Sequence, residues 1–288
     1  MESKSRAISL TVLASLMWGT SFPVIKVGLD YVDPYTFALL RLVCASIVVL
    51  AFAVLMGKFQ PSLFRNRTIW LLGLSNAIGF VLEYVGMNYT TASKTSLLVD
   101  SDVIIIAILS WFTFKERFSR RMKISVVTGF IGAILLVTNG NMSELTGGEL
   151  FGDVTVFLAG VVWAFFMVWN KSLISNGVDL IAMIACVQPV TTLFLIPSAV
   201  ILGSSNVALT GTFGWAAIAW TGILCSATAY FLWAVGLKRL TVTISAIVLL
   251  LEVVWALILS FLLLGESFTM IAAFGAVLIL ASIALASG

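Results

Sequence analysis

The chain has 288 residues, of which 61% are hydrophobic and 10% are charged, with a net charge of +3 and no histidine. Soluble domains carry about 25% charged residues, so this composition excludes a soluble globular protein. The small net charge gives no reason to expect a nucleic-acid partner. The apolar segments are about 20 residues long and lack the alternation of barrel strands, which predicts an all-α integral membrane protein.

Ten apolar segments follow one another along the chain. Asp33 is a predicted N-cap with Pro34 at the first helical position, and Gly57-Lys58 ends the second segment. The polar, glycine-containing stretch 139–149 is the predicted boundary between two halves, residues 1–143 and 144–288. The predicted spans are Ala7–Gly28, Pro34–Met56, Ile69–Tyr89, Ser93–Phe114, Met122–Thr138, Leu150–Lys171, Leu180–Leu202, Phe213–Leu237, Thr243–Leu264 and Thr269–Ala286.

Charges in the loops predict the orientation. Basic residues fall in alternate loops: Lys4, Arg6, Lys58, Arg65, Arg67, the basic run from Lys115 to Lys123, Lys171, Lys238 and Arg239. The other loops hold mainly acidic residues: Asp30, Asp33, Glu144, Glu149 and Glu266. Because basic loops remain on the cytoplasmic side, we expect a multi-pass protein of the cytoplasmic membrane with both termini inside.

The fourth predicted span recurs as the ninth. A shift of about 150 residues places Asp102 on Glu252, Ser110 on Ser260 and Glu116 on Glu266. Five spans per half is an odd number, so the second half must enter the membrane from the opposite side. Inverted repeats of this kind produce two equivalent states around a site near the membrane midplane, which is the geometry of alternating access.

Asp102 and Glu252 are the first candidates for function. Each lies about nine residues into its span, or roughly 13 Å deep at 1.5 Å per residue. A charge there costs at least about 3 kcal/mol. Either the two carboxyls are protonated and lock helices together, or they face a cavity and bind a substrate ammonium or carry a proton. Asp100 lies about 200° around the helix from Asp102, so the two are not expected to share a face.

Four other charged residues are predicted to have structural or gating roles, Arg41, Lys94, Glu116 and Glu266, and Glu83 is a further candidate for substrate binding or proton coupling. Arg41, Glu83 and Lys94 lie in the outer halves of their spans and are expected to form an ion-pair cluster, with contact to a substrate carboxylate as the alternative. Glu116 and Glu266 end their spans at opposite faces. They are expected to anchor backbone N–H groups or a basic neighbour at the start of the following helix, or to act as gates.

Two further pairs obey the repeat. Lys26 and Lys171 lie near span ends and are expected to extend toward the membrane surface. Gly86 and Gly236 are expected to allow close helix contact. The small faces formed by Gly129-x-x-Gly132 and by Gly275 leave a homodimer open.

Aromatic residues supply the remaining cavity candidates, which are Trp18, Phe80, Trp163, Tyr230 and Trp233. An aromatic residue in a membrane helix is more commonly a packing or interface residue. The case is better for Trp18 and Trp163, because the repeat places them equivalently. Trp233 occupies the repeat position of Glu83, so one side of a cavity would be acidic and the other aromatic. Such a lining suits an amphipathic or cationic-headed solute.

Several motifs in register resemble a known family. They are Trp18-Gly19-Thr20-Ser21-Phe22-Pro23, Arg41-Leu42, Lys115-Glu116-Arg117-Phe118 and Leu264-Gly265-Glu266-Ser267. Together they resemble an EamA-type member of the drug/metabolite transporter superfamily over the whole chain. The resemblance implies a secondary transporter of small metabolites, often an amino-acid exporter, with a central cavity. In that family a proline often interrupts the fourth and ninth spans. Val103 and Val253 take that position here, which argues against a proline-based helix break.

The sequence shows no enzyme signature: it has no histidine, no Gly-rich phosphate loop and no Gly-x-Ser-x-Gly elbow. We therefore predict no enzyme, no cofactor and no metal. The predicted function is export of small organic metabolites (amino acids, amines or drug-like solutes) by alternating access, with the substrate, a proton and the lipid bilayer as partners. The alternatives are a non-transporting scaffold or sensor, and an intramembrane aspartyl hydrolase that uses Asp102 and Glu252.

Overall fold

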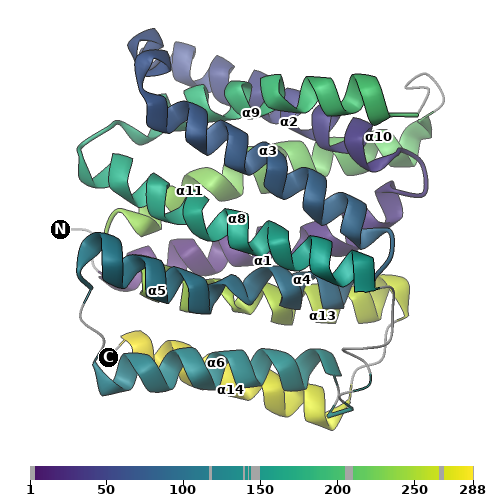
Figure 1. Ribbon diagram of the computed structural model, residues 1–288, viewed down its shortest axis with the longest axis vertical. Coiled ribbons are helices and arrows are strands. Elements are labelled where there is room, and N and C mark those ends of the chain that lie inside the picture. Colours follow the sequence, from purple (N-terminus) through teal and green to yellow (C-terminus); the bar gives the residue numbers. More distant parts are fainter. Residues whose placement is uncertain are drawn as a thin grey trace.

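The computed structural model describes residues 4–116, 119–138, 140–141, 143, 150–204, 210–265 and 269–287, and this part of the chain is helical and without strands (Figure 1). The elements are α1 Lys4–Gly28, α2 Pro34–Leu55, η1 Pro61–Arg65, α3 Arg67–Met87, α4 Ala92–Asp100, α5 Asp102–Phe114, α6 Arg120–Thr138, α8 Leu150–Ser175, α9 Leu180–Leu202, α10 Gly211–Trp220, η3 Thr221–Thr228, α11 Ala229–Leu237, α12 Val242–Leu249, α13 Leu251–Leu264 and α14 Met270–Ser287.

Eight helical stretches of the described residues are long and apolar enough to cross a membrane. They are α1, α2, α3, α4 with α5, α8, α9, α10 through α11, and α12 with α13, so eight of the predicted spans are matched. A shorter apolar helix covers Met270–Ala286 at the position of the tenth predicted span, and α6 lies at the position of the fifth. An all-helical, multi-pass membrane protein is therefore confirmed.

Residues at corresponding positions of the two halves cap the N-termini of corresponding helices. Asp33 caps α2 and Asp179 caps α9, each carboxylate accepting hydrogen bonds from two backbone N–H groups of the first turn. Thr91 and Thr241 cap α4 and α12, each hydroxyl accepting from the N–H three residues later. Such caps satisfy donors that the first turn leaves unbonded. The cap predicted at Asp33 is confirmed.

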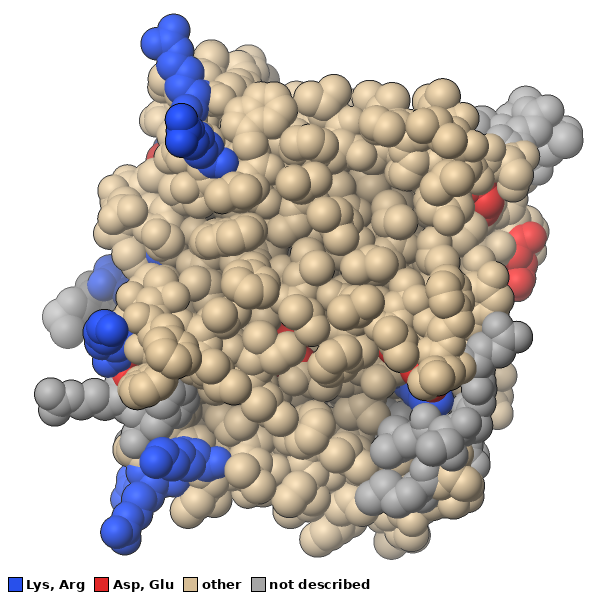
Figure 2. Space-filling model, viewed as in Figure 1, with Lys and Arg blue, Asp and Glu red and all other residues tan. Residues whose placement is uncertain are grey.

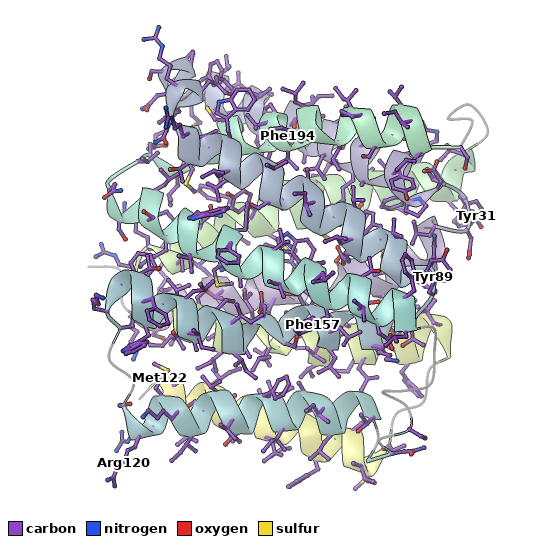
Figure 3. All side chains as sticks on the ribbon, viewed as in Figure 1. Tyr31, Tyr89, Arg120, Met122, Phe157 and Phe194 are labelled. Carbon is purple, nitrogen blue, oxygen red and sulfur yellow. The ribbon has the colours of Figure 1, made fainter. Side chains whose placement is uncertain are left out.

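The outer surface of the molecule is largely apolar, and several charged side chains are buried within the mainly hydrophobic interior. Leu55 is 85% exposed and Val200 is 74% exposed, whereas the side chains of Arg41 and Glu83 are buried. Figure 2 shows a largely uncharged band, with a few acidic atoms visible in gaps near its middle, between an edge with most of the Lys and Arg and an opposite edge with Asp and Glu. Figure 3 shows side chains projecting from the helices along the band between the two charged edges. An apolar band between two charged edges is the surface that a bilayer requires.

Close helix contacts occur at the matched glycines. A Cβ on Gly86 would lie 2.6 Å from Cγ2 of Val156 and 2.8 Å from the carbonyl oxygen of Gly152, both on α8. A Cβ on Gly236 would meet Thr11 and the carbonyl oxygen of Ala7 on α1. The predicted contact role of both glycines is confirmed, and α3 packs on α8 as α11 packs on α1.

Helices α6 and α14 form a pair at one side of the bundle (Figure 1). A Cβ on Gly132 would lie 2.7 Å from the carbonyl oxygen of Gly275, and one on Gly129 would lie 2.8 Å from Oγ of Ser282. The small faces considered for a dimer are therefore used within one chain. The small residues allow α6 and α14 of the same chain to pack closely against each other.

The helices that carry the central carboxyls are interrupted, although no proline is present. Ser101 separates α4 from α5, and Leu250 separates α12 from α13. Their ψ angles are −15° and −17°, well short of the −42° of an α-helix, so the backbone tightens locally. The break is not proline-based, as Val103 and Val253 led us to expect, and the helices are nevertheless interrupted two and three residues before these valines.

The glycine contacts yield a stability prediction. Gly86→Ala and Gly236→Ala should each lower the free energy of unfolding by about 1–3 kcal/mol, because the added methyl meets backbone atoms that cannot move away. Thermal unfolding of the purified protein in detergent measures this. The control is Ala51→Val, which adds volume on an exposed position of α2 and should leave the melting temperature unchanged. Equal melting temperatures for the glycine variants would contradict the packing described.

The cap at α9 yields a pH prediction. Asp179 is partly buried, which opposes its ionisation, but a hydrogen bond from Lys58 at 2.9 Å and two from backbone N–H groups hold its pKa below the usual value. The stabilisation is complete above the pKa of an unfolded aspartate, about 3.9, and is lost as the pH falls through the lower folded pKa.

Asp179→Ala should therefore cost about 1 kcal/mol at neutral pH. Its melting temperature should approach that of the unmodified chain as the pH falls below about 4. Asp30→Ala removes an exposed acidic residue that caps no helix and serves as the control. A gap between Asp179→Ala and the unmodified chain that stays constant down to pH 3 would refute this account.

Candidate functional site

A cavity of about 120 Å³ lies between the helices of both halves. The structure brings into its lining all seven side chains that the sequence offered for substrate binding or proton coupling. They are Trp18, Glu83, Asp102, Trp163, Tyr230, Trp233 and Glu252. They come from α1, α3, α5, α8, α11 and α13, so neither half builds the cavity alone.

Four carboxyls line this cavity: Glu83, Asp100, Asp102 and Glu252, all at most 9% exposed. Asp102 and Glu252 each lie in the first turn that follows a helix interruption. The expectation that Asp100 and Asp102 point in different directions was wrong. The turn at Ser101 lies between them, so the angle of a continuous helix does not apply, and both line the same cavity.

These carboxyls are not locked to one another by hydrogen bonds. Among the described residues, neither Glu83 nor Asp102 nor Glu252 forms a side-chain hydrogen bond or an ion pair within 4 Å. Oδ2 of Asp100 is buried and also has no hydrogen-bond partner in the described part of the chain. The interpretation of Asp102 and Glu252 as a hydrogen-bonded structural lock therefore has no contact to support it.

Arg41 is the one cationic side chain that the described residues contribute to the cavity lining. Its Nε donates to Oγ of Ser226 at 2.6 Å, and its Nη1 donates to the hydroxyl of Tyr84. The guanidinium carbon lies 4.7 Å from the centre of the Phe80 ring, within range of a cation–π interaction. Arg41 is thus held in place by α3 and η3 while it faces the acidic groups.

Lys94 does not line the cavity with Arg41 and Glu83. Its Nζ forms a buried ion pair with Oδ2 of Asp153 at 2.7 Å, which joins the first turn of α4 to the first turn of α8. The predicted three-residue cluster is therefore corrected. Lys94 begins α4, close to the start of α8, whereas the cavity begins further along α4 at Val99 and Asp100.

Glu116 lies at the start of a helix, although not the helix that follows it in the chain. Its carboxylate accepts hydrogen bonds from the N–H of Val242 at 3.0 Å and from Oγ1 of Thr243 at 2.8 Å, at the start of α12. Glu116 therefore joins the end of the first-half helix α5 to a helix of the second half. Its predicted counterpart, Glu266, lies outside the described residues.

The matched lysines bind carbonyl groups at and just after the ends of helices. Nζ of Lys26 lies 2.7 and 2.9 Å from two carbonyl oxygens at the C-terminal end of α3. Nζ of Lys171 lies 2.7 Å from each of two carbonyl oxygens at the C-terminal end of α11. The last carbonyls of a helix lack intrahelical partners and attract cations, which explains these contacts.

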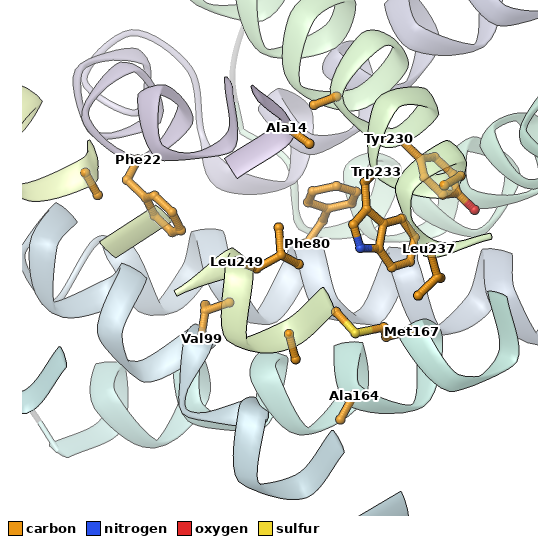
Figure 4. Packing of buried hydrophobic residues seen from close by; sticks show 14 of the residues in the cluster. Ala14, Phe22, Phe80, Val99, Ala164, Met167, Tyr230, Trp233, Leu237 and Leu249 are labelled. Atoms are coloured by element: carbon orange, nitrogen blue, oxygen red, sulfur yellow. The ribbon is translucent and has the colours of Figure 1, made fainter. Parts of the chain in front are cut away.

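Aromatic rings form much of the cavity wall (Figure 4). The rings of Trp18 and Trp233 lie 5.9 Å apart, and Phe166 stacks on Trp233 at 6.4 Å. The polar atom of each predicted Trp and Tyr donates a hydrogen bond to protein. Trp18 donates to the carbonyl of Cys225, and Trp163 donates to Asn76. Tyr230 donates to Asn170, and Trp233 donates to Ser245. The hydrogen-bonding capacity of these rings is therefore directed at the protein, and their carbon atoms are left for the cavity.

Sequence reasoning missed three features of the wall: Asp100 as a lining residue, Gln188 on α9, and the π-helical segment η3. The backbone of η3 receives hydrogen bonds from two other helices: Cys225 accepts from Trp18, and Ser226 accepts from Gln188 at 2.6 Å. π-helical segments frequently lie at functional sites. The small and polar run Thr221–Thr228 was the only available signal, and it does not distinguish a π-helix from an α-helix.

Comparisons with known proteins agree with this architecture. A sequence model of the EamA-like transporter family matches residues 5–138 and again residues 150–288. An uncharacterized transporter of Archaeoglobus fulgidus is 28% identical over 99% of this chain and 98% of its own length. A probable terminal-alkyne amino-acid exporter of Streptantibioticus cattleyicolor is 27% identical over 91% of this chain and 86% of its own.

A solved crystal structure has the same fold, with a TM-score of 0.81 at 18% identity over 99% of this chain and 97% of that one. Relatives in Bacillus subtilis, among them the uncharacterized transporter YyaM at 24% identity over 95% of this chain and 91% of its own, have names of the same kind. The predicted absence of an enzymatic role agrees with a family and relatives that are transporters. With family matches that cover most of both halves, the chain belongs to the EamA-like transporter family and is a multi-pass membrane transporter.

Proposed function

We propose that this protein is a secondary transporter or facilitator that moves small organic metabolites across the cytoplasmic membrane by alternating access. The observation that carries the proposal is the cavity, because side chains of both halves line it and its carboxyls are not bonded to one another. A scaffold has no need of such a chamber. The proposed direction is export, for which the name of the Streptantibioticus relative is the support.

We propose further that ten helices span the membrane as two inverted repeats, residues 1–143 and 144–288, with α6 and α14 as the fifth and tenth spans. Matched contacts support the duplication. Lys26 and Lys171 bind the ends of corresponding helices α3 and α11, and Gly86 and Gly236 approach α8 and α1. The helix interruptions at Ser101 and Leu250 fall at nearly the same position of the two copies.

The orientation with both termini in the cytoplasm is supported by two features. Figure 1 marks both ends of the chain on one side of the bundle. Most Lys and Arg side chains gather at that side in Figure 2, and basic residues favour the cytoplasmic face.

Two contacts between the halves are suited to act as gates. Glu116 joins α5 to the start of α12 near the basic end of the bundle, and Lys94 with Asp153 joins α4 to α8 near the opposite end. Opening the cavity to one side would require one of these contacts to break while the other holds. In this scheme Asp102 and Glu252 bind a substrate ammonium or carry a proton between the two states.

The first test combines Asp102→Asn with Glu252→Gln in proteoliposomes. Labelled amino acids, amines and nucleobases are first screened for uptake by the unmodified chain, and at least one should cross. The double variant should slow that solute at least about tenfold, because each lost charged hydrogen bond is worth roughly 1.5–3 kcal/mol. Its rate should also lose its pH dependence.

The control for this test is Asp30→Asn, on an exposed residue outside the cavity, which should transport normally. Failure of every solute to cross would favour a scaffold or sensor. An unchanged rate and pH profile in the folded double variant would remove Asp102 and Glu252 from the mechanism.

The second test concerns orientation. The native cysteines are buried or half-buried, so an impermeant maleimide applied to intact cells should label them weakly. Asp30→Cys should react, because it places a thiol at the acidic face, whereas Ser62→Cys, on an exposed residue within η1, should react only after cells are opened. The reverse pattern would invert the proposed orientation.

A further inference from the structure

The cavity contains buried hydrogen-bond acceptors that no protein group satisfies. Among the described residues, two such atoms belong to its lining, Oδ2 of Asp100 and Oε1 of Gln188, on side chains that are 8% and 2% exposed. The amide of Gln188 has a defined orientation. Its Nε2 donates to the carbonyl oxygen of Ser226 at 2.6 Å, and because that oxygen only accepts, the amide oxygen must be the free end. A ligand that satisfies the amide oxygen of Gln188 must donate a hydrogen bond, and an ionised Asp100 requires the same.

The charges in the lining favour the same kind of ligand. Four carboxyls (Glu83, Asp100, Asp102 and Glu252) and one guanidinium (Arg41) share the cavity. Arg41 already donates from Nε and Nη1 to protein groups. A carboxylate ligand would add a fifth acidic group to a cavity that already holds four. A cation would instead pair with an ionised carboxyl, and this attraction is strong where solvent screening is weak.

The aromatic wall favours a cation with an apolar body. The polar atoms of Trp18, Trp163 and Trp233 are bonded to protein, and their rings attract cations through their faces. The size of the cavity limits that body. Its 120 Å³ is somewhat smaller than the engineered cavity of about 150 Å³ that accommodates benzene. One ring or a short branched alkyl group is the largest body that fits in this conformation.

We infer that the cavity binds an organic monocation, a primary or secondary ammonium on a body of one ring or less, with Asp100 and Gln188 among the acceptors of its hydrogen bonds. Only the claim that the bound amine crosses the membrane rests on the proposed transport function. The claim that the amine binds rests on the residues that line the cavity. It separates amines from zwitterionic amino acids, because the carboxylate of an amino acid would face four acidic side chains and a single guanidinium, two of whose five N–H groups are already bonded to protein.

Five matched compounds test the inference on the purified full-length protein in detergent, with thermal unfolding as the measure of binding. Benzylamine should raise the melting temperature in a dose-dependent manner at neutral pH. Benzyl alcohol is its neutral analogue, benzoate its anionic one, phenylglycine is benzylamine with a carboxylate, and benzyltrimethylammonium is a cation without N–H donors. Each of these should stabilise the protein less than benzylamine does.

Any of three results would overturn the inference. Benzoate or phenylglycine stabilises as strongly as benzylamine, the neutral alcohol does so, or none of the five compounds raises the melting temperature. Equal stabilisation by benzyltrimethylammonium would refute the need for N–H donors, and with it the assignment of Asp100 and Gln188.

Asp100→Asn tests the assignment of the acceptor directly. It keeps the size of the side chain and removes its charge, and it should weaken benzylamine binding at least about tenfold. Asp30→Asn makes the same change on an exposed residue outside the cavity and should bind benzylamine as the unmodified chain does. If Asp100→Asn does not fold, Gln188→Met, which removes the second acceptor at similar length, should also weaken binding. Unchanged affinity in a folded variant would contradict the role of its residue.

Proteoliposomes separate the two proposals. If benzylamine stabilises the protein but no solute crosses the membrane, the transport proposal fails and the ligand class stands. If phenylglycine or benzoate crosses while benzylamine neither binds nor crosses, the ligand class is wrong and the transport proposal stands.

Discussion

The cost of placing charge inside a lipid bilayer governs this molecule. The chain has few charged residues, and yet four carboxyls and one guanidinium surround a single cavity in the bundle. A lone charge at mid-membrane costs at least about 3 kcal/mol, and more where no water reaches it. The bundle lowers that free-energy cost because it keeps these groups out of contact with lipid, behind helices whose outer faces are apolar. The polar residues that remain elsewhere inside serve mainly to bind backbone atoms.

That second use of polar residues explains how so apolar a chain defines its helix ends. Carboxylates and hydroxyls at Asp33, Thr91, Asp179 and Thr241 satisfy the first N–H groups of helices. The ammonium groups of two lysines satisfy carbonyls at the other ends. Unbonded backbone groups are costly in lipid, so each of these contacts specifies where a helix begins or ends. The same devices recur in both halves, which gives the two halves equivalent frameworks around one chamber.

The chamber differs from its framework because its two sides are not equivalent. Trp233 stands at the position that matches Glu83, and η3 presents carbonyl oxygens that an α-helix would use internally. The lining therefore combines carboxyls on α3, α4, α5 and α13 with aromatic rings on α1, α3, α8 and α11. Recognition of a solute with two unlike ends needs a lining of this kind, with acidic groups and aromatic rings in one cavity.

The sequence alone determined the membrane class, the duplication, the family resemblance and the identity of seven lining residues, because burial in lipid makes each polar or repeated residue informative. It did not determine which polar residues meet. Lys94 bonds to Asp153 instead of joining Arg41, Glu116 binds α12 instead of the next helix, and Asp100 shares the cavity with Asp102. These outcomes depend on how helices far apart in the chain pack, and on a turn at Ser101 that no proline announces. Spacing along one helix describes a single surface, whereas a site between helices exists only once tertiary packing has brought several such surfaces together.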